Sequence, residues 1–136
     1  CIRDRSYARL DEMVRHVEQL LQRLELPYRV LHLCGGDMSF TSASTFDLEV
    51  FSAAQERWLE VSSVSNFEDF QSNRLQLRFR AEDGKRIQLA HTLNGSSLAL
   101  PRIVAALLEN NQMPEGVRIP AVLREWMGTD MLRWRE

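Results

Sequence analysis

The hydrophobic and polar positions near the start of the chain repeat with the period of an α-helix. Apolar residues recur every three or four positions across 7–25 and form one stripe, made of Leu10, Met13, Val14, Val17, Leu20, Leu21 and Leu24. Charged and amide side chains fill the opposite side, so the pattern predicts an amphipathic helix. Pro27 disfavours the helical conformation at Leu26 and ends the element. Residues 1–6 fit no pattern and are expected to be a ragged or non-native end outside the fold.

From Tyr28 onward the period changes to two, which is the spacing of half-buried β-strands. The strands predicted in this way are 28–34, 45–51, 57–64, 74–80 and 85–92. The turn signal Asp83–Gly84 joins the last two as a hairpin, and 52–56 is short enough to join the second and third. Residues 36–44 are small and polar and predict a loop, whereas 66–72 are ambiguous between a loop and a short helix.

The helical period returns after residue 96. Apolar residues then line one face of a predicted helix of about four turns, and they are Leu100, Ile103, Val104, Leu107 and Leu108. Pro101 stands near its start, where a helix tolerates proline. Residues 117–119 predict a short strand, and 120–127 a last helix that Gly128 stops. The order of helix, antiparallel strands and helix predicts an α+β fold built on an antiparallel sheet.

The composition narrows the class of protein. The chain has 136 residues, 44% hydrophobic and 26% charged, as expected for one globular domain or a piece of a larger one. Lys and Arg total 17 against 19 Asp and Glu, which excludes a generic basic nucleic-acid binder but not a local basic face. No apolar run approaches the ~20 residues of a membrane span, so the chain is expected to be cytoplasmic. Cys1 and Cys34 are too few for a disulfide framework or a zinc site, and Cys34 is expected to be a small buried side chain.

Glu60, Ser62 and Ser63 are polar positions in a strand that also carries Trp58 and Val61. A carboxylate beside hydroxyl groups suits Mg²⁺, which takes oxygen ligands and keeps several waters. The alternative, which the pattern alone favours, is an ordinary exposed strand face.

The segment 91–97 carries a strand into a helix through small polar residues. An exposed helix N-terminus suits a polar or anionic ligand, whereas the alternative is that Ser96 or Ser97 caps the helix. Arg102 stands in the first turn of that helix, where a cation opposes the helix dipole. A bound phosphate would compensate through bidentate contacts, and a solvated arginine is the alternative.

Three long runs follow one another along the chain: GDMSFTSASTFDLEVF, EVSSVSNFEDFQSNRLQLRFR and HTLNGSSLALPRIVAALLENNQ. Together they resemble the C-terminal part of bacterial seryl-tRNA synthetases, and the resemblance extends from about Tyr7 to Met127. It implies the catalytic fold of class II aminoacyl-tRNA synthetases, an antiparallel sheet flanked by helices, with residues 7–136 as a C-terminal portion of that domain.

The resemblance also implies a function. The family activates L-serine with ATP to seryl-adenylate and then esterifies serine tRNA, as a homodimer in the cytoplasm, with ATP and Mg²⁺ as cofactors and no membrane. The implied ATP-binding residues are Glu60, Val61, Ser62, Ser63 and Arg102. Glu60 and Ser63 would also hold Mg²⁺, and Ser96 would contact serine. Arg102 would be the catalytic arginine of the third class II motif, bound to the phosphate tail of ATP.

Several positions depart from the family pattern. Pro101 and Ser97 replace glycines, and Ser44 replaces a lysine or similar residue. The resemblance begins just past the second motif, so we expect the helical tRNA-binding arm, the first motif, the serine loop and the second-motif arginine to be missing. The isolated piece is accordingly expected to be an inactive fragment. Two alternatives remain: a truncated paralogue that charges a carrier protein, and a non-catalytic interaction module of the same fold.

Overall fold

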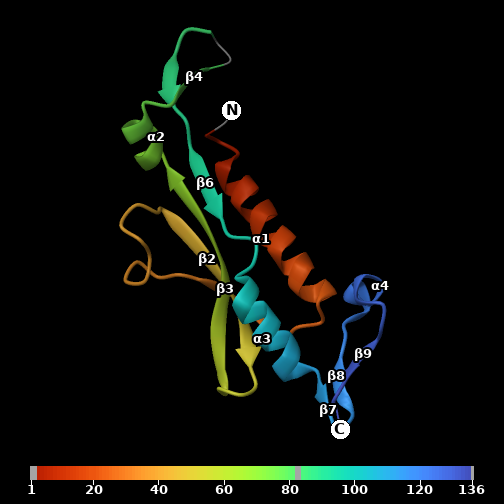
Figure 1. The fold of residues 1–136 in the computed structure, drawn as a ribbon. Coiled ribbons are helices and arrows are strands. Elements are labelled where there is room, and N and C mark those ends of the chain that lie inside the picture. Colours follow the sequence, from red (N-terminus) through yellow and green to blue (C-terminus); the bar gives the residue numbers. More distant parts are fainter. Residues whose placement is uncertain (1–2, 82–83, 136) are drawn as a thin grey trace.

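A computed structural model describes residues 3–81 and 84–135 of the chain (Figure 1). Its largest sheet has four strands, β1 (Tyr28–His32), β2 (Ser44–Ser52), β3 (Arg57–Glu68) and β6 (Thr92–Gly95). The strands are hydrogen-bonded in the order β1-β2-β3-β6, and each neighbouring pair is antiparallel. The strands predicted at 28–34, 45–51 and 57–64 are confirmed, with β3 running on to Glu68.

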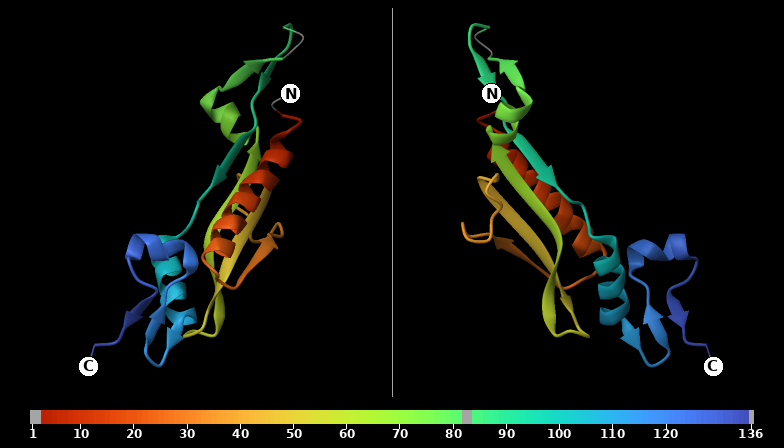
Figure 2. Two further views of the ribbon diagram at one scale, coloured as in Figure 1. Left: turned by 90° about the vertical axis from the view of Figure 1, so that its right-hand side faces the viewer. Right: turned by 60° about the vertical axis from the view of Figure 1, so that its left-hand side comes forward.

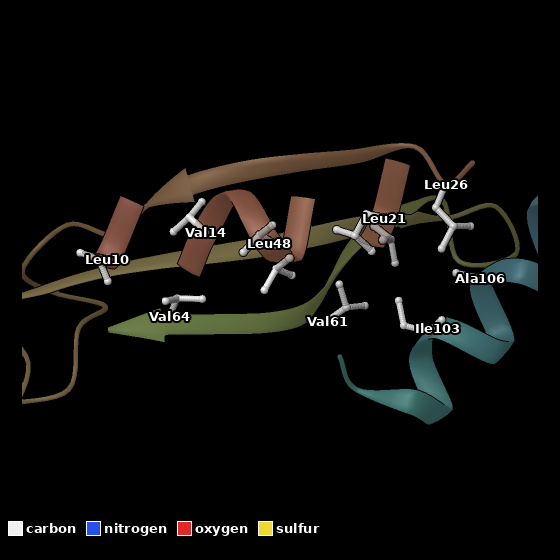
Figure 3. Packing of buried hydrophobic residues seen from close by; sticks show 11 residues of the cluster. Leu10, Val14, Leu21, Leu26, Leu48, Val61, Val64, Ile103 and Ala106 are labelled. Carbon is white, nitrogen blue, oxygen red and sulfur yellow. The ribbon is translucent and has the colours of Figure 1, made fainter. Parts of the chain in front are cut away.

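Two helices pack on one face of this sheet. α1 (Ser6–Arg23) lies along β2, β3 and β6, and α3 (Leu100–Asn110) covers β2 and β3 beyond the end of α1 (Figures 1 and 3). Leu48, Val50 and Val64 are fully buried beneath the helices. The helix residues of the same core are Leu10, Val14, Val17, Leu21, Ile103 and Ala106. Burying a side chain such as Leu48 stabilises the fold by about 1.5–3 kcal/mol, so these contacts fix the helices on the sheet.

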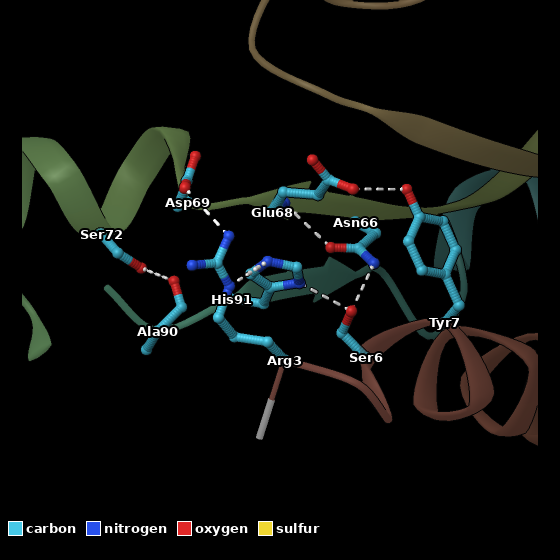
Figure 4. Close-up of polar contacts among 9 residues, drawn as sticks. All are labelled: Arg3, Ser6, Tyr7, Asn66, Glu68, Asp69, Ser72, Ala90 and His91. Carbon is cyan, nitrogen blue, oxygen red and sulfur yellow. Dashed lines mark hydrogen bonds and ion pairs between the residues drawn. The ribbon is translucent and has the colours of Figure 1, made fainter. Parts of the chain in front are cut away.

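The N-terminal end of α1 begins earlier than predicted. Ser6 is the first residue of the helix and is only 2% exposed. Its Oγ lies 2.8 Å from His91 Nδ1 and accepts a hydrogen bond from Asn66 Nδ2 at 3.1 Å (Figure 4). Arg3 Nε donates to His91 Nε2 at 3.0 Å. The expectation that 1–6 stay outside the fold is therefore corrected for Arg3 and Ser6, while Cys1 and Ile2 lie outside the described residues.

The segment between β3 and β6 differs most from its prediction. The ambiguous 66–72 splits into the end of β3 and the start of a short helix, α2 (Phe70–Leu75). Gln76 then adopts a left-handed φ of 54°, which ends α2. The predicted strands 74–80 and 85–92 are thus shortened to β4 (Arg78–Arg80) and β5 (Ile87–Leu89), which pair only with each other. Of the predicted turn, Asp83 lies outside the described residues.

The C-terminal segment forms a small sheet of its own beyond α3. Its strands are β7 (Gln112–Met113), β8 (Gly116–Arg118) and β9 (Met131–Arg133), of which sequence analysis predicted only the second. The predicted last helix is a 3₁₀ turn, Ala121–Leu123, followed by α4 (Arg124–Met127), and Gly128 ends it with a left-handed φ of 67°. Figure 2 shows this sheet and the β4–β5 hairpin at opposite ends of the molecule.

Within the described residues, every helix is too short or too polar to cross a membrane.

Candidate functional site

The face of the four-stranded sheet that points away from α1 and α3 is polar, and we call it the open face. Cross-strand partners share a face, and the register pairs Asp47 with Ser63 and Glu49 with Glu60. These four residues alternate with the buried Leu48, Val50, Ser62 and Val64. The open face therefore carries carboxylates and a hydroxyl, whereas the covered face carries the core.

A β-bulge places the two proposed magnesium ligands on this face together. Glu60 and Ser63 are three positions apart, so in a regular strand they would point to opposite faces. The register shifts between Leu48 opposite Ser62 and Glu49 opposite Glu60, which leaves Val61 as an extra residue in β3. Because of this extra residue, Glu60 returns to the face of Ser63. The Glu60 side chain is exposed, and Ser63 is half-buried.

Val61 and Ser62, which the resemblance also assigns to ATP, turn the other way. Both side chains are only 1% exposed, and Val61 belongs to the hydrophobic core (Figure 3). The Ser62 hydroxyl donates to the carbonyl oxygen of Ser96 at 2.5 Å. A nucleotide on the open face would therefore meet the main chain of these two residues and not their side chains.

Ser96 lies beside Ser63 where the chain leaves β6. The N–H of Ser96 donates to the carbonyl oxygen of Ser63 at 3.0 Å, and the N–H of Ser63 donates to Ser96 Oγ at 3.0 Å. The residue is exposed. The alternative in which Ser96 or Ser97 caps the following helix is wrong, because the N-cap of α3 is Ala99 and no side chain caps it.

Arg102 lies in the first turn of α3, as predicted, and reaches back to the same strand. Its Nη1 donates a short hydrogen bond to the carbonyl oxygen of Glu60. The N–H of Ala99 donates to the carbonyl oxygen of Val61 at 2.7 Å. Main-chain and side-chain hydrogen bonds thus join 96–102 to 60–63 along their whole length. The guanidinium remains exposed beside Glu60.

These side chains suit a polyphosphate with a divalent cation. Mg²⁺ is usually held by one or two carboxylates together with waters and substrate phosphates, and Glu60 and Ser63 offer one carboxylate and one hydroxyl on one face. Among the described residues, no group of three His, Cys, Asp or Glu side chains is placed to hold a metal. The donor set therefore fits a magnesium ion shared with a nucleotide better than a metal held by protein ligands alone.

The three departures from the family pattern leave this geometry intact. Pro101 occupies the first turn of α3, where its missing N–H costs no helical bond. Ser97 is exposed. Ser44 is only 8% exposed, and its Oγ lies 3.1 Å from His32 Nε2, so its side chain stays within the fold.

Sequence analysis passed over Asp47. Its Oδ1 is buried and has no hydrogen-bond partner among the described residues, although Ser63 stands opposite it in the sheet. Burying a carboxylate oxygen without a partner is costly, so a donor from a ligand or from another part of the protein would stabilise this residue. The alternation of 45–51 already placed Asp47 on the polar face, and only the register with β3 shows its neighbour.

Arg29 and Glu49 form an ion pair on the open face beside Trp58. Arg29 Nε donates to Glu49 Oε2 at 2.6 Å, and the guanidinium lies 4.8 Å from the centre of the Trp58 ring. These contacts neutralise Glu49 at the edge of the open face.

Cys34 is exposed, and its thiol donates to Asp37 at 3.4 Å, so the prediction of a buried Cys34 is wrong.

The chain matches a known class of domain. Residues 1–111 match the family model described as the tRNA synthetase class II core domain (G, H, P, S and T). The chain belongs to this family, and the α+β class II fold expected from the sequence is confirmed.

Proteins similar to this chain carry the name of one member of that family. The serine–tRNA ligase of Salinibacter ruber is 59% identical over 126 residues, which cover 92% of this chain and 29% of that protein. The serine–tRNA ligase of Thermomicrobium roseum is 56% identical over the same share of this chain and 28% of its own length. The crystal structure of seryl-tRNA synthetase from Pyrococcus horikoshii complexed with ATP superimposes with a TM-score of 0.91 at 36% identity. The superposition covers 98% of this chain and 30% of the Pyrococcus horikoshii chain. This chain therefore spans less than a third of the length of these relatives.

Proposed function

We propose that the chain is the C-terminal part of the catalytic domain of a serine–tRNA ligase. In that enzyme it would contribute to activating L-serine with ATP to seryl-adenylate and to transferring the seryl group to serine tRNA. The observation that carries the proposal is the joining of 60–63 to 96–102 at the open face, because it brings the residues expected to bind ATP, magnesium and serine together. The identity to serine–tRNA ligases supports the choice of amino acid.

Arg102 has the catalytic role in this proposal. The serine carboxylate attacks the α-phosphorus of ATP, an oxygen–phosphorus bond forms, and the bond to the leaving pyrophosphate breaks. The nucleophile is already ionised, so the step needs alignment and neutralisation of charge rather than a general base. The planar guanidinium of Arg102 matches phosphate oxygens in two-point contacts, and its bond to the Glu60 carbonyl oxygen holds it over the strand.

Glu60 and Ser63 would hold Mg²⁺. The ion would supply charge neutralisation on the polyphosphate. Glu60 presents an exposed carboxylate and Ser63 a half-buried hydroxyl on the same face. The main chain of Val61 and Ser62 would complete the nucleotide contact, since their side chains are buried.

Ser96 would contact L-serine. Its Oγ accepts the N–H of Ser63, so its hydroxyl hydrogen is available to an acceptor on the substrate. In the whole enzyme we also propose serine tRNA as partner, a homodimer as assembly and the cytoplasm as location.

A hybrid enzyme tests the proposal. The part of the Salinibacter ruber serine–tRNA ligase that aligns with this chain is replaced by the chain, and serine-dependent ATP–pyrophosphate exchange is measured. The proposal predicts exchange by the hybrid and none by the 136-residue chain alone. Exchange by the chain alone would indicate a minimal standalone enzyme. A folded hybrid without exchange, or with aminoacylation of a carrier protein instead of tRNA, would contradict the proposal in favour of the interaction module or the paralogue.

Ser96→Ala in the hybrid tests the role of Ser96. Losing one hydrogen bond to the substrate costs about 0.5–3 kcal/mol, so the KM for serine should rise by several fold or more while the KM for ATP changes little. An unchanged KM for serine with weakened ATP binding would show that Ser96 acts on the strand alone.

A further inference from the structure

Ser62 is a buried serine within the run that the resemblance assigns to ATP. Its side chain is 1% exposed and lies on the covered face, opposite Leu48. A ligand on the open face cannot reach its hydroxyl. The hydroxyl nevertheless has a partner, the carbonyl oxygen of Ser96 at 2.5 Å.

The hydrogen bond from Ser62 goes to a carbonyl oxygen that would pair with the Ser63 N–H in a regular sheet. In a regular antiparallel pair, Ser63 and Ser96 would exchange two main-chain hydrogen bonds. One of them is present, from the N–H of Ser96 to the carbonyl oxygen of Ser63 at 3.0 Å. The other is not, because the N–H of Ser63 donates to Ser96 Oγ at 3.0 Å. The freed carbonyl of Ser96 accepts from Ser62 instead.

This change of hydrogen-bond partners determines what the Ser96 hydroxyl can do. Its Oγ is held in place as an acceptor of the Ser63 N–H, which leaves its hydroxyl hydrogen as a donor. Among the described residues no acceptor for that hydrogen is recorded. Without the Ser62 hydroxyl, the Ser96 carbonyl would turn back toward the Ser63 N–H and displace Oγ from it, because an unpaired carbonyl is costly.

We propose that Ser62 is a positioning residue for the substrate serine and not an ATP contact. Its buried hydroxyl holds the Ser96 carbonyl out of the sheet, and this keeps Ser96 Oγ fixed as a donor to the amino acid. The inference rests on the proposed function for its catalytic meaning, whereas the positioning of Ser96 can be tested without any activity.

The first test is amide hydrogen exchange in the 136-residue chain, with Ser62→Ala. We expect the exchange rate of the Ser63 amide to change on the order of tenfold, because its acceptor changes from the Ser96 hydroxyl to the Ser96 carbonyl oxygen. The Ser96 amide, which keeps the Ser63 carbonyl oxygen as its acceptor, should change little. The matched control is Ser72→Ala, because Ser72 is also a fully buried serine whose hydroxyl donates to a main-chain carbonyl, that of Ala90. The control should leave the Ser63 amide unchanged.

The second test is steady-state kinetics in the hybrid enzyme. Ser62→Ala should raise the KM for serine by about tenfold, as expected for a misplaced hydrogen-bond donor, with the KM for ATP changed by less than about twofold. Ser62→Cys keeps the size and a weak donor, so it should recover part of the loss. Ser72→Ala should leave both constants unchanged.

Three results would overturn the inference. Unchanged exchange at the Ser63 amide in Ser62→Ala would show that Ser62 does not position Ser96. A rise in the KM for ATP alone would return Ser62 to the nucleotide site. Equal effects of Ser62→Ala and Ser72→Ala would indicate a purely structural role. A hybrid that is inactive before any substitution would contradict the proposed function, while the exchange measurement would still decide the positioning.

Discussion

The two faces of the four-stranded sheet are built from the same strands, but one holds the hydrophobic core and the other the candidate site. The covered face packs Leu48, Val50 and Val64 against α1 and α3. The open face carries Asp47, Glu49, Glu60 and Ser63, which alternate with those residues along β2 and β3. Alternation alone accounts for the division, and the bulge at Val61 adjusts it so that Glu60 joins Ser63.

The comparison shows where rigidity in the site comes from. Glu60 and Ser63 point away from the core, but the strand that carries them is packed against α1 and α3 on its other face. Arg102 and Ser96 follow β6, and hydrogen bonds to 60–63 tie them to β3. Sites held by packed secondary structure keep their geometry better than sites on free loops. Substitutions on the two faces should therefore separate stability from activity.

The largest effect is expected on the covered face. Leu48 is 0% exposed, and Leu48→Ala should lower the free energy of unfolding by about 2–5 kcal/mol because it removes buried methyl groups and leaves a cavity. Glu60→Gln, on the neighbouring strand but on the open face, should change it by less than about 0.5 kcal/mol. Urea unfolding of both variants makes the comparison. Equal losses would show that the open face is itself part of the core.

Substituting Arg102 should lower activity strongly and change stability little. In the hybrid enzyme, Arg102→Ala should slow ATP–pyrophosphate exchange about 10²–10³-fold, as expected for removing a charge stabiliser. Arg102→Lys should recover little, because lysine lacks the planar two-point geometry. Thermal melting without ligand should be nearly unchanged, since Arg102 is exposed.

The control for this prediction is Arg124→Ala. Arg124 is also an exposed arginine that donates to a main-chain carbonyl, that of Ile119, and its loss should leave exchange unaffected. A large drop in melting temperature for Arg102→Ala, or near-normal exchange for Arg102→Lys, would contradict the phosphate-binding role.

Asn66 is a buried polar residue on the covered side of β3. It is 0% exposed, its Nδ2 donates to Ser6 Oγ, and its Oδ1 accepts the N–H of Glu68 (Figure 4). Asn66→Ala removes both hydrogen bonds and leaves the N–H of Glu68 without this acceptor, so it should cost about 1–3 kcal/mol. The exposed Asn73 offers a control in Asn73→Ala, which should cost much less. A loss in Asn66→Ala no larger than in the control would mean that the start of α1 is held by other contacts.

The smallest effect concerns Tyr7. Its hydroxyl donates to Glu68 Oε1 at 2.8 Å. This hydrogen bond, and to a lesser degree burial and the negative charge of Glu68, raise the pKa of Tyr7 above its ordinary value of 10.0. The folded state therefore favours the neutral phenol, so this contribution to stability is present below the ordinary pKa and is lost as pH rises through the raised value.

Ultraviolet titration checks this prediction. Glu68→Gln should lower the pKa of Tyr7 toward its ordinary value, and Tyr7→Phe should make the loss of melting temperature at alkaline pH slightly smaller. Unchanged titration in Glu68→Gln would show that the hydrogen bond does not control Tyr7.

Periodicity predicted the core well on α1 and β2 and less well on α3. Most of the stripe from Leu10 to Leu21 and the alternation around Leu48 correspond to core residues. The exposed exceptions are Leu20 of that stripe and Leu100, Val104 and Leu108 of the predicted α3 face. The bulge was not predictable, since no glycine or other residue typical of a bulge stands at or beside Val61. Ser62, which the resemblance assigns to ATP, has its side chain on the covered face.

Elements without strong periodicity were predicted least well. The alternation of 74–80 suggested one strand, but α2 extends to Leu75 and the left-handed Gln76 follows. The short strand β9 pairs with β8 through contacts that no local pattern indicates. Arg3 and Ser6 were expected to lie outside the fold because residues 1–6 fit no local pattern. Their hydrogen-bond partners, Asn66 and His91, lie far away in the sequence.

The central claim is that ATP and L-serine bind on the open face, between 60–63 and 96–102. A crystal structure of the hybrid enzyme with ATP, Mg²⁺ and L-serine tests it most directly. The account predicts the nucleotide over Glu60 and Ser63, with the Arg102 guanidinium within hydrogen-bond distance of a phosphate and Ser96 Oγ within that distance of the amino acid. A nucleotide bound elsewhere, with Arg102 still turned only to the Glu60 carbonyl oxygen, would contradict it.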